Sequence, residues 1–129
     1  MEVVATLVIL GVGLPALLAA ARDATVRRAS VQQQIVARWL ACEKLEDVIA
    51  DRHSSTRGWS YITSANYPVE DTVNGFTAFA RTTTIGETGP DLATAGAGYR
   101  TVTVTVTYRD ARDGSKSITL ATVLTDYDQ

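Results

Sequence analysis

The sequence predicts an α+β fold in which a long N-terminal helix packs on a small antiparallel sheet of three or four strands. Two observations lead to this prediction. Residues 3–21 carry no charge and continue into an amphipathic stretch, so a helical pattern runs for about 50 residues. Residues 76–124 then show the alternation and the β-branched composition of strands. A chain of 129 residues leaves room for one small domain beside such a helix.

The apolar part of the helix is long enough to cross a bilayer, because residues 3–21 span about 28 Å as an α-helix. Glu2 stands at its head, and a carboxylate in lipid is costly and usually functional, although it also fits the headgroup level. Gly11, Gly13 and Pro15 weaken the helix and predict a kink or local melting. They indicate either close helix packing with local unwinding or an ordinary membrane helix, where both residue types are common.

Two simpler interpretations of this segment remain open. Cleavage after Ala21 would make it a secretory signal peptide, but the chain opens with Glu2 rather than with a basic region. An ordinary anchor is the other interpretation, and positive-inside counting would then place Arg22, Arg27 and Arg28 in the cytoplasm. That placement conflicts with an exported domain.

Residues 22–52 predict an amphipathic continuation of the helix that ends near residues 50–54. Its expected packing face is an apolar stripe recurring every three or four positions, made of Val31, Ile35, Trp39, Cys42, Leu45 and Ile49. Cys42 is expected to be a small packing residue, with an intermolecular or reactive thiol as the alternative. His53 is expected in a surface loop.

The second half of the chain predicts a three-stranded meander. Residues 58–75 indicate an irregular connector with at most one short strand, and residues 76–85, 99–108 and 116–124 indicate strands. A flexible loop at 86–98 and a polar turn containing Asp113-Gly114 separate these strands. The expected inner face consists of Val102, Val104, Val106 and Tyr108 together with Ile118, Leu120, Thr122 and Leu124. The helix stripe is the available cover for this face.

The opening EVVATLVILGVGLPALLAA, with a Glu heading an apolar helix that runs into an amphipathic one and then a small sheet, resembles the type IV pilin family and the pseudopilins of type II secretion. The stretch ALACEKLEDVIADR looks like a helical motif of I-type minor pseudopilins and related minor pilins, and SITLATVL looks like their C-terminal strand. The resemblance implies a filament subunit of the bacterial inner membrane, with its globular domain in the periplasm or outside.

The resemblance also implies a role for Glu2, which matches the Glu of the family's N-terminal motif. Paired with the free N-terminal ammonium of a neighbouring subunit, its carboxylate would be compensated and would set the axial register. The family's basic leader, which a prepilin peptidase removes before N-methylation, is not found before Glu2, and the aromatic residue of the motif is missing. Such a leader is expected upstream, and it would supply the cytoplasmic positive charge.

No catalytic constellation is found, so the chain is not expected to be an enzyme. Cys42 and His53 are too few for a zinc site. No cofactor is expected; calcium at Glu87, Asp91, Asp110 and Asp113 is the one weak alternative, because their spacing fits no EF-hand. A net charge of -2 argues against nucleic acid. A basic patch of the competence type is the less favoured interpretation of residues Arg81, Arg100, Arg109, Arg112 and Lys116.

The predicted organisation is a transmembrane or filament-core helix at 1–21, its amphipathic continuation at 22–52, and a loop-and-sheet part at 53–129, with 22–129 forming one domain. The predicted function is a minor pilin or pseudopilin of a pilus, secretion or competence system. A membrane-tethered envelope module, binding a ligand through the 86–98 loop, is the alternative from another class, and a secreted protein cleaved after Ala21 is a third.

Overall fold

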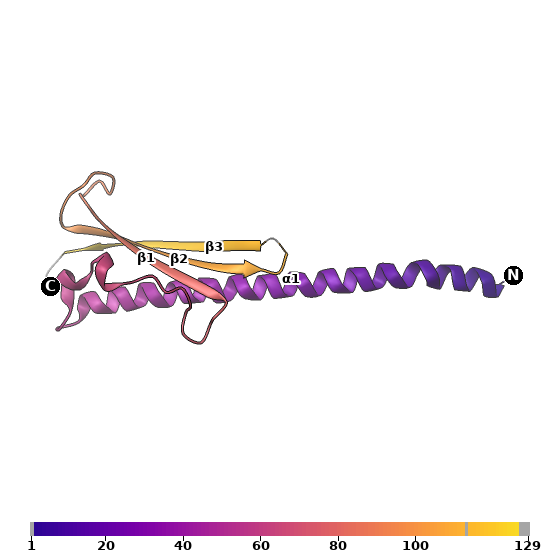
Figure 1. The fold of residues 1–129 in the computed structure, drawn as a ribbon. Helices are drawn as coiled ribbons and strands as arrows, with labels where there is room; N and C mark the ends of the chain where they lie inside the picture. The colour runs from indigo at the N-terminus through magenta and orange to yellow at the C-terminus, as the bar shows by residue number, and fades with distance from the viewer. Residues whose placement is uncertain (1, 113, 127–129) are drawn as a thin grey trace.

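The computed structural model describes residues 2–112 and 114–126, and it confirms the α+β class. A single helix, α1 (Glu2–His53), runs the length of the molecule, and a three-stranded sheet lies along its C-terminal half (Figure 1). A four-residue helix α2 (Gly58–Tyr61) and a 3-10 turn η1 (Ser64–Asn66) follow α1. The strands are β1 (Phe79–Thr88), β2 (Tyr99–Asp110) and β3 (Gly114–Thr125).

The sheet is an antiparallel meander with β2 in the centre. Val104 of β2 lies opposite Thr83 of β1 on one side and Leu120 of β3 on the other. The predicted inner face is confirmed, since Val102, Val104 and Val106 are fully buried and alternate with more exposed threonines. β1 begins and ends three residues later than expected, so residues 86–88 belong to the strand and not to the loop. The Asp113 half of the predicted turn lies outside the described residues, and Gly114 adopts a φ of 80°.

The helix covers the sheet with a different face from the one predicted. Its fully buried residues are Ala37, Leu40, Ala41 and Val48, whereas most of the predicted stripe is exposed and Cys42 and Leu45 are only half-buried. The true face is rotated from the predicted stripe by roughly 140° at about 100° per residue. Two small alanines thus pack on the sheet side together with Leu40 and Val48, while the larger Val31, Ile35 and Trp39 are left outside.

Buried arginines tie the sheet to the helix. Arg81 of β1 is 6% exposed and donates to the backbone oxygen of Leu40 at 2.9 Å, to Glu43 at 3.1 Å and to Glu70 at 2.8 Å. Lys44 of the helix reaches the same Glu70 at 2.7 Å. Because a buried charge needs several partners, this network fixes β1 and the segment before it in one position on α1.

A second buried arginine holds the far end of the domain. Arg100 of β2 donates to the backbone oxygen of Trp59, pairs with Glu87 at 2.6 Å, and lies 4.4 Å from the centroid of the Trp59 ring. The connector predicted as irregular therefore contains a short helix, α2, anchored by a cation–π contact. Strand-like pairing in this connector is limited to isolated bridges at Glu70 and Val73.

Candidate functional site: the exposed surface of the long helix

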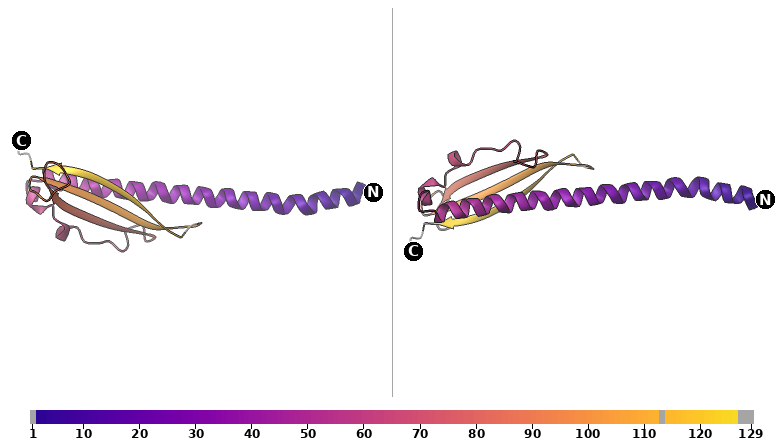
Figure 2. Two further views of the ribbon diagram at one scale, coloured as in Figure 1. Left: turned by 90° about the horizontal axis from the view of Figure 1, so that it is seen from above. Right: turned by 90° about the horizontal axis from the view of Figure 1, so that it is seen from below.

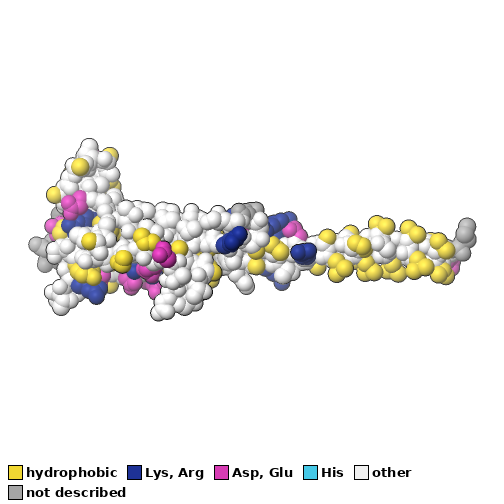
Figure 3. Space-filling model, viewed as in Figure 1, with side chains coloured by type: hydrophobic (Ala, Val, Ile, Leu, Met, Phe, Trp, Pro, Cys, Tyr) yellow, Lys and Arg dark blue, Asp and Glu magenta, His cyan; other side chains and the backbone are white. Residues whose placement is uncertain are grey.

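Residues 3–21 of α1 project away from the sheet as an uncovered apolar segment, which we call the rod. Figures 1 and 2 show it extending past the end of the sheet in every view, and Figure 3 shows hydrophobic side chains along its visible surface. None of the most apolar 18-residue window is buried inside the molecule. By its length and composition this helix could cross a membrane. Large apolar side chains on every side of a helix need lipid or other apolar helices around them.

Glu2 lies in the first turn of α1, at the tip of the rod, and is exposed. Its backbone oxygen accepts a hydrogen bond from the Thr6 hydroxyl at 2.8 Å. No salt bridge to its carboxylate occurs within the residues that the structure describes. The position leaves the carboxylate accessible to a group outside this molecule.

Gly11, Gly13 and Pro15 lie within an unbroken helix. The local melting predicted at these residues is not observed, because α1 is helical from Glu2 to His53 with Pro15 inside it. The axis curves gently along its length instead of breaking (Figure 2), and proline in a membrane helix is tolerated when the turns on either side keep their hydrogen bonds. A Cβ added at Gly11 or Gly13 would meet nothing within 4 Å, so these glycines serve no packing within the molecule.

An exposed apolar stripe continues from the rod onto the domain. Val31, Ile35 and Trp39 are 54%, 62% and 56% exposed, and they follow one another at intervals of four residues on one face of α1. The Trp39 ring leans on Phe76 at 6.0 Å between centroids. Ile35 also borders a shallow groove of about 440 Å³ between the helix and β3, lined by Gln34, Ile35, Arg38, Ile118 and Leu120. The stripe is therefore part of the surface, although the sequence pattern assigned it to the core.

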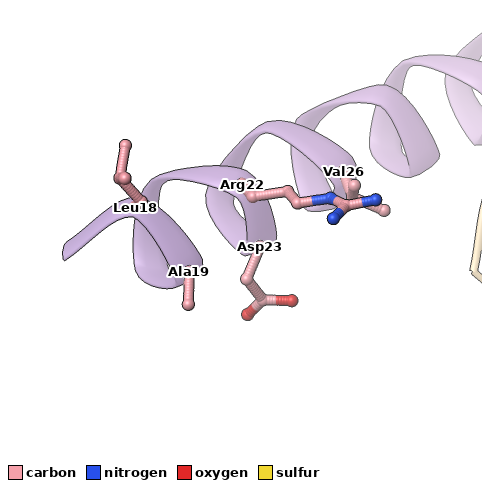
Figure 4. Close-up of a pocket in the computed structure, with 5 residues that line it drawn as sticks. All are labelled: Leu18, Ala19, Arg22, Asp23 and Val26. Carbon is pink, nitrogen blue, oxygen red and sulfur yellow. The ribbon is translucent and has the colours of Figure 1, made fainter. Parts of the chain in front are cut away.

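The hollow beside Leu18, Ala19, Arg22, Asp23 and Val26 is a different kind of feature. Figure 4 shows that these five lining residues all come from consecutive turns of α1. It is the flank of a helix where apolar and charged side chains meet. Such a surface suits an interface between lipid and water better than a small-molecule site, which is normally a concave cavity.

The acidic positions considered for calcium are separated and already engaged. Glu87 pairs with Arg100, Asp110 with Lys116 at 2.7 Å, and Asp91 accepts hydrogen bonds within its own loop from Ala93 and Thr94. These loop hydrogen bonds, from the backbone and hydroxyl of Thr94 first, lower the pKa of Asp91. Asp113 lies outside the described residues, and no cluster of three metal-ligating side chains occurs among the remainder.

Cys42 is a free thiol and is half-buried on the helix, and His53 is the exposed last residue of α1 and not part of a loop. A polar hollow near the end of α1 contains Asp51, which accepts from Tyr67 at 2.9 Å and pairs with Arg57 at 2.6 Å. Burial, followed by this hydrogen bond, raises the pKa of Tyr67. The arrangement holds the segment after the helix in place.

No family model, curated protein or solved structure matches the chain.

Proposed function

We propose that the chain is a structural subunit, a minor pilin or pseudopilin, of a type IV pilus or a type II secretion pseudopilus. In this proposal residues 3–21 hold the subunit in the bacterial inner membrane, with the sheet domain in the periplasm or outside, and later pack among the helices of other subunits. The observation that carries the proposal is the bare apolar rod continuous with the helix of the domain. A membrane or a bundle of like helices would cover it.

The exposed stripe favours neighbouring helices over lipid as the final cover. Val31 lies ten residues beyond Ala21, which corresponds to about 15 Å along the helix. Hydrocarbon that covers residues 3–21 would end well before Val31, and Trp39 lies still farther from it. Because Val31, Ile35 and Trp39 are more than half exposed, a partner surface outside the membrane accounts for them better than a simple anchor does.

Glu2 would set the axial register of the filament. Its side chain is exposed in the first turn of α1, and its carboxylate would meet the N-terminal ammonium of an adjacent subunit in an apolar environment. An unpaired carboxylate in such surroundings is costly, so positions along the axis that leave Glu2 without its partner are disfavoured. Gly11 and Gly13 would let the helix of an adjacent subunit approach the backbone of α1 closely. The space beside both glycines is open in the single subunit.

The proposal is tested by producing the full chain behind a prepilin leader in a bacterium with a working pilus or pseudopilus. Glu2→Ala is compared with Glu46→Ala, which removes an exposed carboxylate from the same helix inside the domain. Sheared filament fractions are probed for the chain. We expect the parent and Glu46→Ala in the filaments and Glu2→Ala in the membrane only.

Equal amounts of both variants in filaments would contradict the register role of Glu2. Absence of the parent chain from filaments, with normal membrane insertion, would contradict the filament proposal and favour a tethered envelope module. Recovery of the domain as a soluble product beginning after Ala21 would favour a secreted protein.

A further inference from the structure

Basic side chains gather where the apolar rod meets the domain. Three of them, Arg22, Arg27 and Arg28, follow the uncharged run on α1. Three more come from the β2–β3 hairpin: Arg109 near the end of β2, Arg112 in the turn and Lys116 near the start of β3. Figure 3 shows dark blue side chains at this junction, immediately beyond the hydrophobic surface of the rod. We call these six residues the basic collar.

The two parts of the collar are held together by specific contacts. Arg112 pairs with Asp23 at 2.8 Å, and Asp23 also pairs with Arg27 at 2.8 Å. Asp110 has a fully buried side chain and accepts from the Ser30 hydroxyl at 2.9 Å. The tip of the β2–β3 hairpin is therefore fixed against the first turns of α1 beyond the apolar run, although about 80 residues separate them in the sequence.

Acidic residues neutralise only part of the collar. Residues 22–28 and 109–116 contain six of the twelve basic and three of the fourteen acidic side chains. These two segments thus carry a charge of +3, and the remainder of the chain carries -5. Arg22, Arg28 and Arg109 form no ion pair with any described residue. This separation of charge is large for a chain with a net charge of -2.

The collar surrounds the helix at the depth of a headgroup layer. At about 100° per residue, Arg22, Arg27 and Arg28 point in three directions roughly 100–140° apart. They occupy about 9 Å along the axis, directly after a run that fills about 28 Å of hydrocarbon, and a headgroup layer extends about 5–8 Å beyond the hydrocarbon on each side. The contact between Arg112 and Asp23 brings the hairpin tip to the same depth.

We propose that the basic collar binds the headgroups of anionic phospholipids and so seats the sheet domain directly on the membrane surface. This inference rests on residues 3–21 crossing a membrane, and it holds whether or not the chain enters a filament. The acidic part of a second copy of the chain could also bind the basic collar, because its charge is complementary. The lipid is favoured because the collar begins at the first residue after the apolar run and encircles the helix there.

The test uses the full chain in neutral detergent micelles, titrated with phosphatidylglycerol or with phosphatidylcholine while backbone amide resonances are followed. We expect phosphatidylglycerol to shift the resonances of residues 22–30 and 109–116, with an apparent affinity that falls as salt is added. Phosphatidylcholine should leave them in place.

The critical variant is Arg22→Gln, Arg28→Gln, Arg109→Gln. These three exposed side chains form no ion pair among the described residues, so we expect the variant to keep its fold. Since each basic side chain near an anionic surface contributes about fivefold in affinity, the triple variant should bind phosphatidylglycerol roughly 100-fold more weakly. The matched control, Arg38→Gln, Arg52→Gln, Arg57→Gln, removes the same charge farther along the helix and beyond its end. It should retain most of the affinity.

An equal loss in both triple variants would overturn the proposal, since it would indicate a response to total charge. Resonance shifts that depend on protein concentration and not on the lipid would also overturn it and would identify a second copy as the occupant. The titration does not require filament assembly, so its outcome is independent of the filament result for Glu2.

Discussion

The two ends of α1 belong to one uninterrupted helix, but they have opposite relations to the rest of the molecule. Residues 3–21 contact nothing in the sheet and expose large aliphatic side chains throughout. The C-terminal half buries Ala37, Leu40, Ala41 and Val48 completely against β2 and its neighbours. The apolar content of a helix therefore does not say what covers it, because the more apolar end is the uncovered one.

Side-chain size accounts for much of this difference. The packed half buries two alanines beside Leu40 and Val48, and its largest side chain, Trp39, is 56% exposed. The rod presents Leu, Ile and Val in all directions, which suits a fluid or multi-helix environment without one fixed partner.

Truncating the same residue type in the two halves should give very different losses of stability. Leu40→Ala removes a fully buried side chain, and we expect the free energy of unfolding to fall by about 3–4 kcal/mol. Leu17→Ala, at a position that is 68% exposed, should change it by less than about 0.5 kcal/mol. Urea unfolding of the full chain in micelles, followed by the fluorescence of Trp39 and Trp59, measures both. Similar losses would show that the rod is packed against the domain.

Replacing the buried Arg81 should cause the next largest loss in the free energy of unfolding. Arg81→Met leaves Glu70 without its closest guanidinium partner and the backbone oxygen of Leu40 without its side-chain donor. Because Glu43 and Glu70 keep some contact with water, we expect a loss of about 2–3 kcal/mol. Arg57→Met is the control, since Arg57 pairs with Asp51 at the surface, and it should cost less than about 1 kcal/mol. The same unfolding assay measures both, and equal costs would contradict the clamping role of Arg81.

Stability should also depend on pH through the carboxylates that join the sheet to the helix. Hydrogen bonds from Lys116 first, and then from Ser30, hold the pKa of Asp110 below its ordinary value. Partial burial raises the pKa of Glu70, but the hydrogen bonds from Arg81 and Lys44 outweigh this and keep it lowered.

A lowered pKa in the folded state means that the unfolded chain binds more protons in acid. The contribution to stability is therefore complete above an unfolded carboxyl pKa of about 4 and is lost as the pH falls through the folded values. Urea unfolding at pH 7, 5, 4 and 3 should show little change down to pH 5 and a decline below about pH 4. Asp110→Asn should weaken this decline, and Asp126→Asn, at an exposed position, should leave it unchanged. A decline of the same size in both variants would contradict the assignment.

Pro15→Ala should have the smallest effect on the domain. Since α1 already continues through Pro15, the substitution restores one backbone donor in the rod and removes no contact with the sheet. We expect the unfolding curve to shift by less than about 0.5 kcal/mol and amide exchange around residues 11–19 to slow in micelles. A clear change in the stability of the domain would mean that the rod and the domain unfold together.

The sequence pattern predicts the sheet better than the helix face. Strict alternation in residues 99–108 leaves only one choice of inner face, because a shift of one position would bury threonines in place of valines. The helical pattern does not select a single buried face in this way. Val31, Ile35 and Trp39 form a convincing apolar stripe, but Ala37 and Ala41 give a weak hydrophobic signal although both are fully buried.

The buried arginines also escape prediction. Arg81 and Arg100 stand at inward positions of β1 and β2, where alternation alone would indicate apolar residues. Their partners, Glu70 and Trp59, come from the connector that the sequence leaves irregular. The alternation could have indicated their burial, because Arg81 shares a strand face with Phe79 and Arg100 shares one with Val102. The position and apolar surroundings of Glu2 follow from the sequence, but its partner is a proposal.

One consequence of the unbroken helix is mechanical. At about 1.5 Å per residue, the 52 residues of α1 form a strut of about 78 Å with no hinge between the tip and the sheet. Its hydrogen bonds lie nearly parallel to the axis, and the clamp at Arg81 prevents the sheet from turning about it. A push applied along the axis at Glu2 therefore reaches the domain through one continuous helix, without an intervening loop.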